Sequence, residues 1–286
     1  MKEKMNWAAE ATIRGAIANL RDAGALEKRS TDHASNSVAT VLTPAGEEIQ
    51  TVPEALEVWL AQCPEGPIQI DNPHVKVAVK ALAEGWSSTL MRLLATSPLT
   101  LTELSDLIHD VSYPALERRI NWMRATGQIS PLPKEGRGTR YAPTSWLGRA
   151  IAPLAVAGRC ERRHIDDAPP ITDVEIETSF LLALPLVDLP RRARGSCVLV
   201  SRTDPVIGED PDPQVAGVAV EVSKGEIVSS TVTIDSEPTT WVIGTSDVWL
   251  NAVIDGNFEH LRIGGTNPRL ALDLVKGIHC SLFTKR

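Results

Sequence analysis

The stretch from residue 86 to residue 141 changes from a helical to a strand-like spacing of apolar positions. In its central part, apolar residues fall at i, i+4 and i+7 and so share one face of a helix: Leu116, Ile120 and Met123. Two shorter helical patterns precede this helix. After Gly127, two short apolar runs at 129–132 and 139–142 flank a polar tip. The pattern predicts three helices followed by a β-hairpin.

Residues that begin and end helices stand around these patterns. Ser112 is suited to cap the third helix, with Pro114 in its first turn, where a missing N–H costs nothing. Gly127 follows the last apolar residue, as a C-terminal stop would. Thr102 is expected to cap the preceding helix, and the residues expected to be buried there are Leu104, Leu107 and Ile108.

Polar and basic residues cover the rest of the third helix and the hairpin. The helical spacing directs Arg118, Arg119 and Trp122 away from the apolar face. The candidates for contact with base edges are Tyr113, Glu117, Arg118 and Asn121. The candidates for phosphate contact are Lys134, Arg137 and Arg140. A short protruding helix beside a basic hairpin fits a groove of duplex DNA and its phosphates.

A family resemblance rests on the order and spacing of residues across this stretch: Trp86, Leu90, Leu93, Leu94, Leu99, Leu104, Ile108, Leu116, Arg119, Ile120, Gly127, Ile129, Tyr141, Leu147 and Gly148. With this pattern the stretch resembles the winged helix-turn-helix of the HxlR branch of the MarR-like transcription regulators. The resemblance implies that double-stranded DNA is a partner. The alternatives are an unrelated small helical domain that packs the same apolar residues, and a winged helix that binds protein.

Residues 5–60 look like an incomplete copy of the same unit. When Gly24 is aligned with Gly127, three apolar positions match those of the third helix: Ile13, Ile17 and Leu20. A hairpin of the runs 27–30 and 38–42 follows, and then a helical pattern that carries Ile49, Val52, Leu56 and Leu60. The first two helices of the unit are absent from this copy. Its apolar face is therefore expected to meet water, unless another surface covers it or the protein begins upstream.

From residue 173 onward, helical and strand-like patterns mix. Val218, Val220 and Val222 alternate with Ala219 and Glu221, as in a half-buried strand. The other strand-like runs are 196–201, 227–234, 240–244 and 261–264, and the helical patterns are 176–186, 246–254 and 268–282.

Three segments of this part carry a second resemblance: 216–232, 241–265 and the closing helix with its Leu282-Phe283 end. They are similar to the sterol carrier protein fold as it appears behind HxlR-type DNA-binding domains. That fold encloses an apolar cavity, so the resemblance implies an apolar small-molecule ligand. The candidates for ligand contact are Trp241, Trp249, Phe258, Ile263, Leu274 and Ile278. The alternative is a filled core in a domain that serves only in dimerisation.

These patterns together predict an α+β chain of tandem winged helices, the first of them partial, followed by a sterol-carrier-like α/β sandwich domain. The predicted boundaries are 1–62 for the partial unit, 72–163 for the DNA-binding domain and 174–286 for the ligand-binding domain. The linker at 159–170 is polar and ends in two prolines.

The distribution of charge favours DNA, although the net charge of −7 does not. Residues 113–163 hold ten Lys or Arg against three Asp or Glu, a local charge of +7. The flanking ranges 1–112 and 164–286 carry −6 and −8. A basic segment between acidic ones suits a DNA-binding element, and a solvated basic helix face is the simpler alternative.

The remaining composition indicates a cytoplasmic protein without membrane association. The four cysteines form no CxxC pair, which favours free thiols over disulfides or a zinc site: Cys63, Cys160, Cys197 and Cys280. No apolar run approaches the length of a membrane span, and the first residues lack the apolar core of a signal peptide.

The sequence shows no catalytic or cofactor motif. It contains no GxSxG, P-loop or HExxH, and its six histidines lack metal-ligand spacing. We therefore expect no enzyme activity, no cofactor and no metal. The predicted function is a DNA-binding transcription regulator that senses an apolar small molecule. The alternative is a protein that sequesters a hydrophobic small molecule and carries a degenerate winged helix.

Apolar stripes on two predicted helices are candidate pairing surfaces for a homodimer, because regulators of this kind usually pair half-sites on DNA. One stripe is Ile151, Leu154 and Ala155, and the other is Ile49, Val52 and Leu56. The two copies within the chain could instead pair with each other.

Overall fold

The computed structural model describes residues 10–30, 38–83, 86–133, 138–165, 168–202, 215–232 and 239–284. The chain forms two compact units. The first comprises Met1–Ala55 and Val156–Pro169, and the second comprises Leu56–Ala155 and Pro170–Arg286. The fold is of the mixed α+β kind, as predicted. No helix among the described residues is long and apolar enough to cross a membrane.

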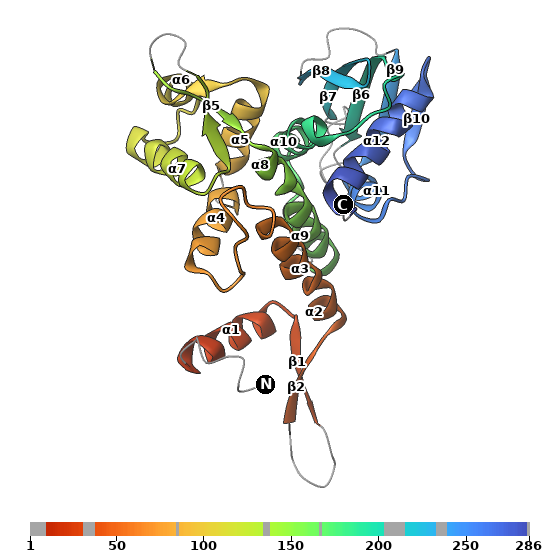
Figure 1. Ribbon diagram of the computed structural model, residues 1–286. Coiled ribbons are helices and arrows are strands. Elements are labelled where there is room, and N and C mark those ends of the chain that lie inside the picture. The colour runs from red at the N-terminus through yellow and green to blue at the C-terminus, as the bar shows by residue number, and fades with distance from the viewer. Residues whose placement is uncertain are drawn as a thin grey trace. The chain divides into compact units, whose positions relative to one another are not determined.

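The first unit begins with a helix and a hairpin, labelled in Figure 1. Its elements are α1 (Glu10–Asp22), β1 (Leu26–Ser30), β2 (Val38–Leu42), α2 (Pro44–Ile49), the first half of α3 (Thr51–Leu60) and the last half of α9 (Ile151–His164). Strands β1 and β2 pair antiparallel, with Leu26 opposite Leu42. The predicted helix and hairpin are confirmed, and β1 begins one residue before the predicted run.

The second unit starts with helices and a small sheet. Its elements in this part are α4 (Pro73–Ala83), α5 (Ser87–Thr96), β3 (Leu99–Thr100), α6 (Leu101–Leu107), α7 (Tyr113–Ala125), β4 (Ile129–Pro131), β5 (Arg140–Pro143) and α8 (Ser145–Arg149). The strand order is β3-β5-β4, with all pairs antiparallel. Three helices followed by a hairpin are therefore confirmed, and β3 is an additional strand.

The predicted inner face of α7 is confirmed, since Leu116, Ile120 and Met123 are 0–2% exposed. Two details of α6 were predicted wrongly. Its N-cap is Thr100 rather than Thr102, because the Thr100 hydroxyl accepts from the Glu103 N–H while the Glu103 carboxylate accepts from the Thr100 N–H. Leu107 is 53% exposed, because it stands in the last turn of this short helix, away from the core.

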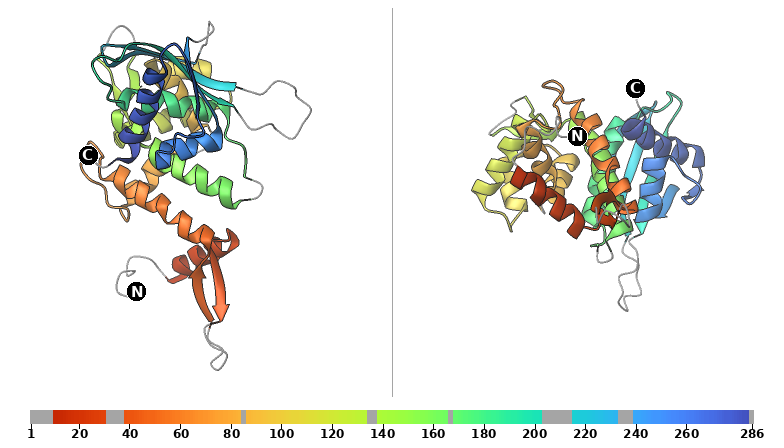
Figure 2. Two further views of the ribbon diagram at one scale, coloured as in Figure 1. Left: turned by 90° about the vertical axis from the view of Figure 1, so that its right-hand side faces the viewer. Right: turned by 90° about the horizontal axis from the view of Figure 1, so that it is seen from below.

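The C-terminal part of the second unit holds a five-stranded sheet. Its elements are α10 (Asp173–Ala183), a 3-10 turn (Leu184–Leu186), β6 (Gly195–Arg202), β7 (Val215–Ser223), β8 (Glu226–Thr231), β9 (Thr240–Thr245), α11 (Ser246–Asp255), β10 (Arg262–Gly265) and α12 (Pro268–Phe283). The strand order is β10-β9-β6-β7-β8, with β6 and β9 parallel and the other pairs antiparallel. Helices α11 and α12 lie side by side (Figures 1 and 2).

Burial along β7 confirms the predicted alternation. Val218, Val220 and Val222 are at most 5% exposed, whereas Glu221 faces solvent. The central strand β6 is instead buried on both sides, since the neighbouring residues Val198 and Leu199 are 5% and 0% exposed. One face of the sheet therefore belongs to the main core, and the middle of the other face is also shielded from water.

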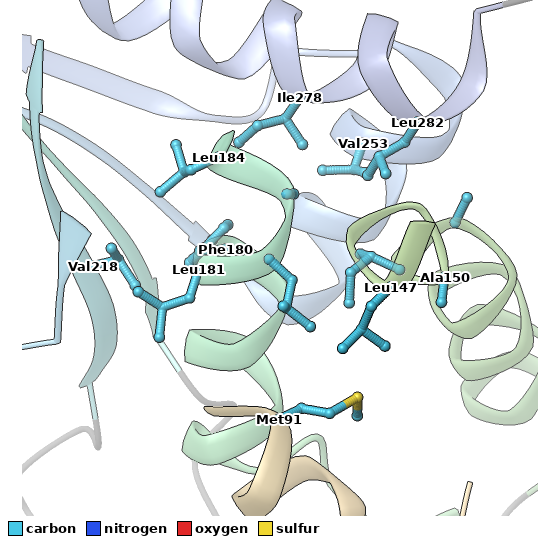
Figure 3. Close-up of a cluster of buried hydrophobic side chains, with 14 of the residues drawn as sticks. Met91, Leu147, Ala150, Phe180, Leu181, Leu184, Val218, Val253, Ile278 and Leu282 are labelled. Atoms are coloured by element: carbon cyan, nitrogen blue, oxygen red, sulfur yellow. The ribbon is translucent and has the colours of Figure 1, made fainter. Parts of the chain in front are cut away.

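Helix α10 is the centre of the core of the second unit. A capping box of Thr172 and Glu175 begins it, and consecutive residues Phe180–Ala183 are all buried. Figure 3 shows its side chains between Val218 of β7 on one side and Leu147 on the other, with Met91 of α5 below. The last turn of α10 is apolar all round and therefore packs against neighbours on every side.

Contacts of α10 with α5 and α8 are close. Arg92 of α5 pairs with Glu177 at 2.6 Å, and the Thr178 hydroxyl donates to the Ser88 carbonyl at 3.2 Å. A Cβ at Gly148 in α8 would lie 2.5 Å from the Leu182 carbonyl oxygen, so the two backbones approach as closely as glycine allows. The compact units thus divide the chain differently from the predicted domains 1–62, 72–163 and 174–286, which remain a prediction.

Candidate nucleic-acid interface

Helix α7 separates a buried face from an exposed polar face. The four predicted base-contact residues are all exposed on it: Tyr113, Glu117, Arg118 and Asn121. Tyr113, at the first position of α7, is 46% exposed. An arginine and an asparagine on one exposed face offer the bidentate donors and acceptors that read guanine and adenine in a major groove. The arrangement is therefore chemically suited to contact base edges.

Arg119 fixes α7 against α4, and its burial corrects the prediction that it points away from the core. It is 2% exposed, and its guanidinium donates to the carbonyls of Lys80 and Ala81 at 3.0 Å and to the Ser87 hydroxyl at 2.7 Å. The two carbonyls belong to the last turn of α4, where backbone acceptors lack helical partners. Burial lowers the pKa of Arg119.

Cationic side chains lie over the Trp122 ring of α7. The guanidinium carbon of Arg118 lies 5.8 Å from the centre of this ring, and the Lys80 ammonium lies 5.7 Å from it. Such cation–π contacts contribute about 0.5–1 kcal/mol at exposed sites. They restrain the Arg118 side chain along the surface of α7 and reduce the entropy it would lose on binding a partner.

Arg140 of the hairpin has protein partners. Its guanidinium pairs with the Glu103 carboxylate at 2.8 Å and donates to the Pro98 carbonyl at 2.9 Å. Hydrogen bonds from Thr100, and then the charge of Arg140, hold the pKa of Glu103 below its ordinary value. Arg140 therefore ties β5 to the start of α6, and part of its charge is already compensated. Lys134 and Arg137, the other predicted phosphate contacts, lie outside the described residues.

Three of the six predicted ligand residues meet in the core of the C-terminal part. Leu274 and Ile278 of α12 are at most 1% exposed, and Trp249 of α11 is 5% exposed. The Trp249 ring packs edge-on against Phe180 at 4.8 Å, and its indole N–H donates to the Val200 carbonyl at 2.8 Å. Phe258 and Ile263 pack at the margin of the same core. These contacts are those of packed side chains.

Trp241 is separated from that group by the alternation of β9. Its neighbour Val242 is fully buried in the core, so Trp241 points to the opposite face of the sheet. There its indole covers Gly264 of β10, where a Cβ would lie 2.3 Å from the ring. The structure thus does not bring all six residues to one place.

A hollow of about 210 Å³ lies elsewhere in the C-terminal part, between α12 and the segment after the 3-10 turn. Its lining residues are Asp188, Gly277, Cys280, Ser281 and Thr284. Drug-sized ligands occupy pockets of about 300–1,000 Å³ that are mostly apolar. This hollow is smaller and includes none of the predicted ligand residues.

Comparison of the chain with protein-family models, with curated proteins and with solved structures found no match. Within the described ranges, no three His, Cys, Asp or Glu side chains gather as metal ligands would.

Proposed function

We propose that this protein is a transcription regulator that binds duplex DNA through α7. In this proposal α5, α6 and α7 with the β3-β5-β4 sheet form a winged helix-turn-helix similar to that of HxlR-type regulators. The outer face of α7 enters the major groove, and the hairpin between β4 and β5 lies along the phosphates. The C-terminal part, from α10 to α12, has the role of a sterol-carrier-like domain that binds an apolar small molecule.

The observation that carries the DNA-binding proposal is the division of α7 into two faces. Leu116, Ile120 and Met123 are buried on one side, and the exposed face presents Tyr113, Arg118 and Asn121 together. Arg119 anchors the same helix to α4, so the exposed face stands on a rigid support. A helix held in this way loses little conformational entropy when it enters a groove.

In this proposal, residues of α7 contact base edges and residues of the hairpin contact phosphates. Arg118 and Asn121 are assigned to base edges, and Lys134 and Arg137 to phosphates. Arg140 is assigned a positioning role, because its guanidinium is held by Glu103 and Pro98. Its removal is expected to loosen the hairpin more than to remove a phosphate contact.

The ligand-binding half of the proposal rests on the α+β arrangement of the C-terminal part and on its resemblance to sterol carriers. Trp249, Leu274 and Ile278 are packed, so a ligand among them would have to displace side chains. Sequestration of a hydrophobic molecule without DNA binding is the second candidate. The exposure of Ile17 and Leu20 in the first copy, 37% and 40%, favours a degenerate winged helix there.

Selection of bound sequences from a random duplex library tests DNA binding without knowledge of the operator. We expect a motif to be enriched by the full chain and lost by Arg118→Ala. Arg269→Ala, an exposed arginine on α12, is the matched control and should enrich the same motif. Failure of the wild-type chain to retain any duplex at low salt would reject the regulator and leave sequestration.

A further inference from the structure

The segment from α1 to α3 repeats the segment from α7 to α9 element by element. Helices α1 and α7 each have 13 residues. Each is followed by a glycine in the left-handed region, Gly24 at φ 73° and Gly127 at φ 76°. A hairpin, a short helix and a long helix then follow in both copies.

The repeat extends to individual hydrogen bonds at the threonine that begins each short helix. The N–H of Thr43 donates to the Ala25 carbonyl at 3.1 Å, and that of Thr144 donates to the Gln128 carbonyl at 2.9 Å. The Thr43 hydroxyl donates to Gly24 at 2.6 Å, and the Thr144 hydroxyl donates to Gly127 at 2.8 Å. Each hydroxyl also caps its own helix. The two segments are therefore structural copies.

The end of α3, from the first copy, packs on α8 of the second copy. Trp59 and Trp146 stack with ring centres 4.4 Å apart and planes 6° apart. Each indole N–H donates to the backbone carbonyl of the other residue at 2.8 Å. Beyond them, Arg149 donates to the Gln62 side chain at 2.7 Å.

The reciprocal contact joins the end of α9, from the second copy, to α2 of the first. The Glu48 carboxylate of α2 lies 2.9 Å from the Arg163 guanidinium and 2.8 Å from the His164 ring. The Arg159 guanidinium lies 3.7 Å from the same carboxylate. The division into compact units shows the same exchange. The unit that holds the start of the first copy also contains the end of α9, and the unit that holds the second copy also contains the end of α3. Contacts of this reciprocal kind define a two-fold interface, in which each partner gives and receives the same element.

We propose that the two copies form, within one chain, the counterpart of a two-fold dimer, and that α1 is a second and sequence-tolerant DNA contact in addition to α7. In this proposal, the apolar stripes predicted as homodimer surfaces pack within the chain instead of against a second chain. In α9, Ile151 and Val156 are at most 5% exposed, and Leu154 and Ala155 are partly buried. The pairing requirement of the regulator is met without a second chain.

The two DNA-contacting helices differ at the positions that read bases. In α1 the positions equivalent to Arg118 and Asn121 hold Gly15 and Ala18, whose side chains cannot reach a base edge. Arg14 and Arg21 stand at the equivalents of Glu117 and Arg124. We assign both arginines to phosphates, because two of the base-reading positions on this helix carry no side chain long enough to reach a base, and phosphate contacts carry no sequence information. The DNA site is therefore expected to be unequal, with one half read by α7 and the other half tolerant of sequence.

Light scattering on the full chain at micromolar concentration tests the pairing and needs no DNA. The expected mass is that of one chain, 31.0 kDa. A mass of two chains would overturn intramolecular pairing. If that larger species were then split by Ile17→Lys, the apolar face of α1 would be its interface.

The second contact, which rests on the proposed DNA binding, is tested with labelled mixed-sequence duplexes of about 12 and about 30 base pairs, shorter and longer than two half-sites one helical turn apart. The longer duplex should bind about tenfold tighter or more, because the second contact is then made at high effective concentration. Arg14→Gln with Arg21→Gln should lower the slope of log K against log salt by about 1.8 on the longer duplex only.

Arg269→Gln with Lys276→Gln, two exposed cations on α12, is the matched control and should leave that slope unchanged. Equal salt slopes for the wild type and the α1 variant would remove α1 from the interface while leaving DNA binding by α7 intact. Binding to neither duplex would reject the proposed function itself and the α1 contact with it, whereas the measured mass would still decide the pairing.

Discussion

Trp59 and Trp146 share two hydrogen bonds and a stacking contact, although 87 residues separate them in the chain. Both are at most 2% exposed. Two indole donors and two carbonyl acceptors thus satisfy one another inside a site that excludes water. Because no polar atom of this exchange is left over, the pair can be buried without the penalty of an unmet hydrogen bond.

Trp146→Phe keeps an aromatic ring but removes the indole N–H that donates to the Trp59 carbonyl. That carbonyl keeps the Gln62 N–H as a donor, so the change should cost about 0.5–1.5 kcal/mol of unfolding free energy. Trp146→Ala also leaves a cavity and should cost about 3–5 kcal/mol. Urea unfolding followed by circular dichroism measures both. Equal stability of wild type and the phenylalanine variant would mean that the indole N–H contributes nothing.

Arg118 and Arg119 are adjacent but should respond to mutation in opposite ways. Arg119→Ala removes a buried guanidinium that serves three acceptors and should cost about 2–4 kcal/mol of stability. Arg118→Ala should change stability by less than about 1 kcal/mol, because it removes only an exposed cation–π contact. In binding to the selected motif, the same change should cost about 1–3 kcal/mol. A loss of stability in the Arg118 variant as large as that in the Arg119 variant would contradict this division.

Glu48 should make the stability of the first unit depend on acidity. Burial opposes ionisation of this carboxyl, but hydrogen bonding to His164 and the charge of Arg163 outweigh it, so the pKa of Glu48 lies below its ordinary value of 4.5. A carboxyl with a lowered pKa in the folded state stabilises the fold above its ordinary pKa, and this stability is lost as the pH falls through the folded-state value. Glu48→Gln should flatten the pH dependence of unfolding below about pH 4.5. An unchanged pH profile would contradict the role of Glu48.

The four thiols should react at different rates with a thiol reagent. Burial raises the pKa of Cys197 to about 12, so its reactive thiolate is scarce at neutral pH. Cys280 is exposed, whereas Cys63, Cys160 and Cys197 are buried. In the folded protein one thiol should react fast, and Cys280→Ser should abolish that phase. Survival of a fast phase in this variant would show that one of the buried thiols is accessible.

Two glycines should respond in opposite ways to alanine. A Cβ at Gly264 would lie 2.3 Å from the Trp241 ring, so Gly264→Ala should cost about 1–3 kcal/mol by overpacking. A Cβ at Gly158, within α9, would meet nothing within 4 Å. Gly158→Ala should therefore stabilise the protein by about 0.5–1 kcal/mol, because alanine loses less backbone entropy in a helix. Thermal unfolding of both variants measures the contrast.

Spacing alone was sufficient where one face of an element is buried. The i, i+4, i+7 series in α7 and the alternation in β7 predicted the buried side chains correctly. The burial of Arg119 was missed, although it stands at i+3 from Leu116 and so belongs to the same face. The prediction placed Arg119 outside the core because it is charged, whereas its spacing placed it inside. Its burial is possible because the carbonyls of Lys80 and Ala81 accept its hydrogen bonds.

Contacts between distant segments could not be predicted from local patterns. Strand β3 is two residues long and exists because β5 lies beside it, with Leu99 opposite Tyr141. The separation of Trp241 from Trp249 follows from the strand alternation at Val242, which was available in the sequence but was not applied to the aromatic residues. The hydrogen-bond exchange between the tryptophans of α3 and α8 could not be predicted from local spacing. In the described part of the chain, four helices and three strands separate α3 from α8.

The approach of α8 to α10 at Gly148 limits how this protein could be rebuilt from parts. Modules that fold separately can be recombined, because a linker places no demand on the surfaces it joins. Here, the Leu182 carbonyl approaches Gly148 so closely that an added Cβ would lie 2.5 Å from its oxygen. A grafted C-terminal half would have to bring its own backbone equally close. It would also have to supply a carboxylate for Arg92, as Glu177 does. Shuffling at the linker between α9 and α10 should therefore yield chimaeras that fail to fold, unless both contacts are transferred with the grafted half.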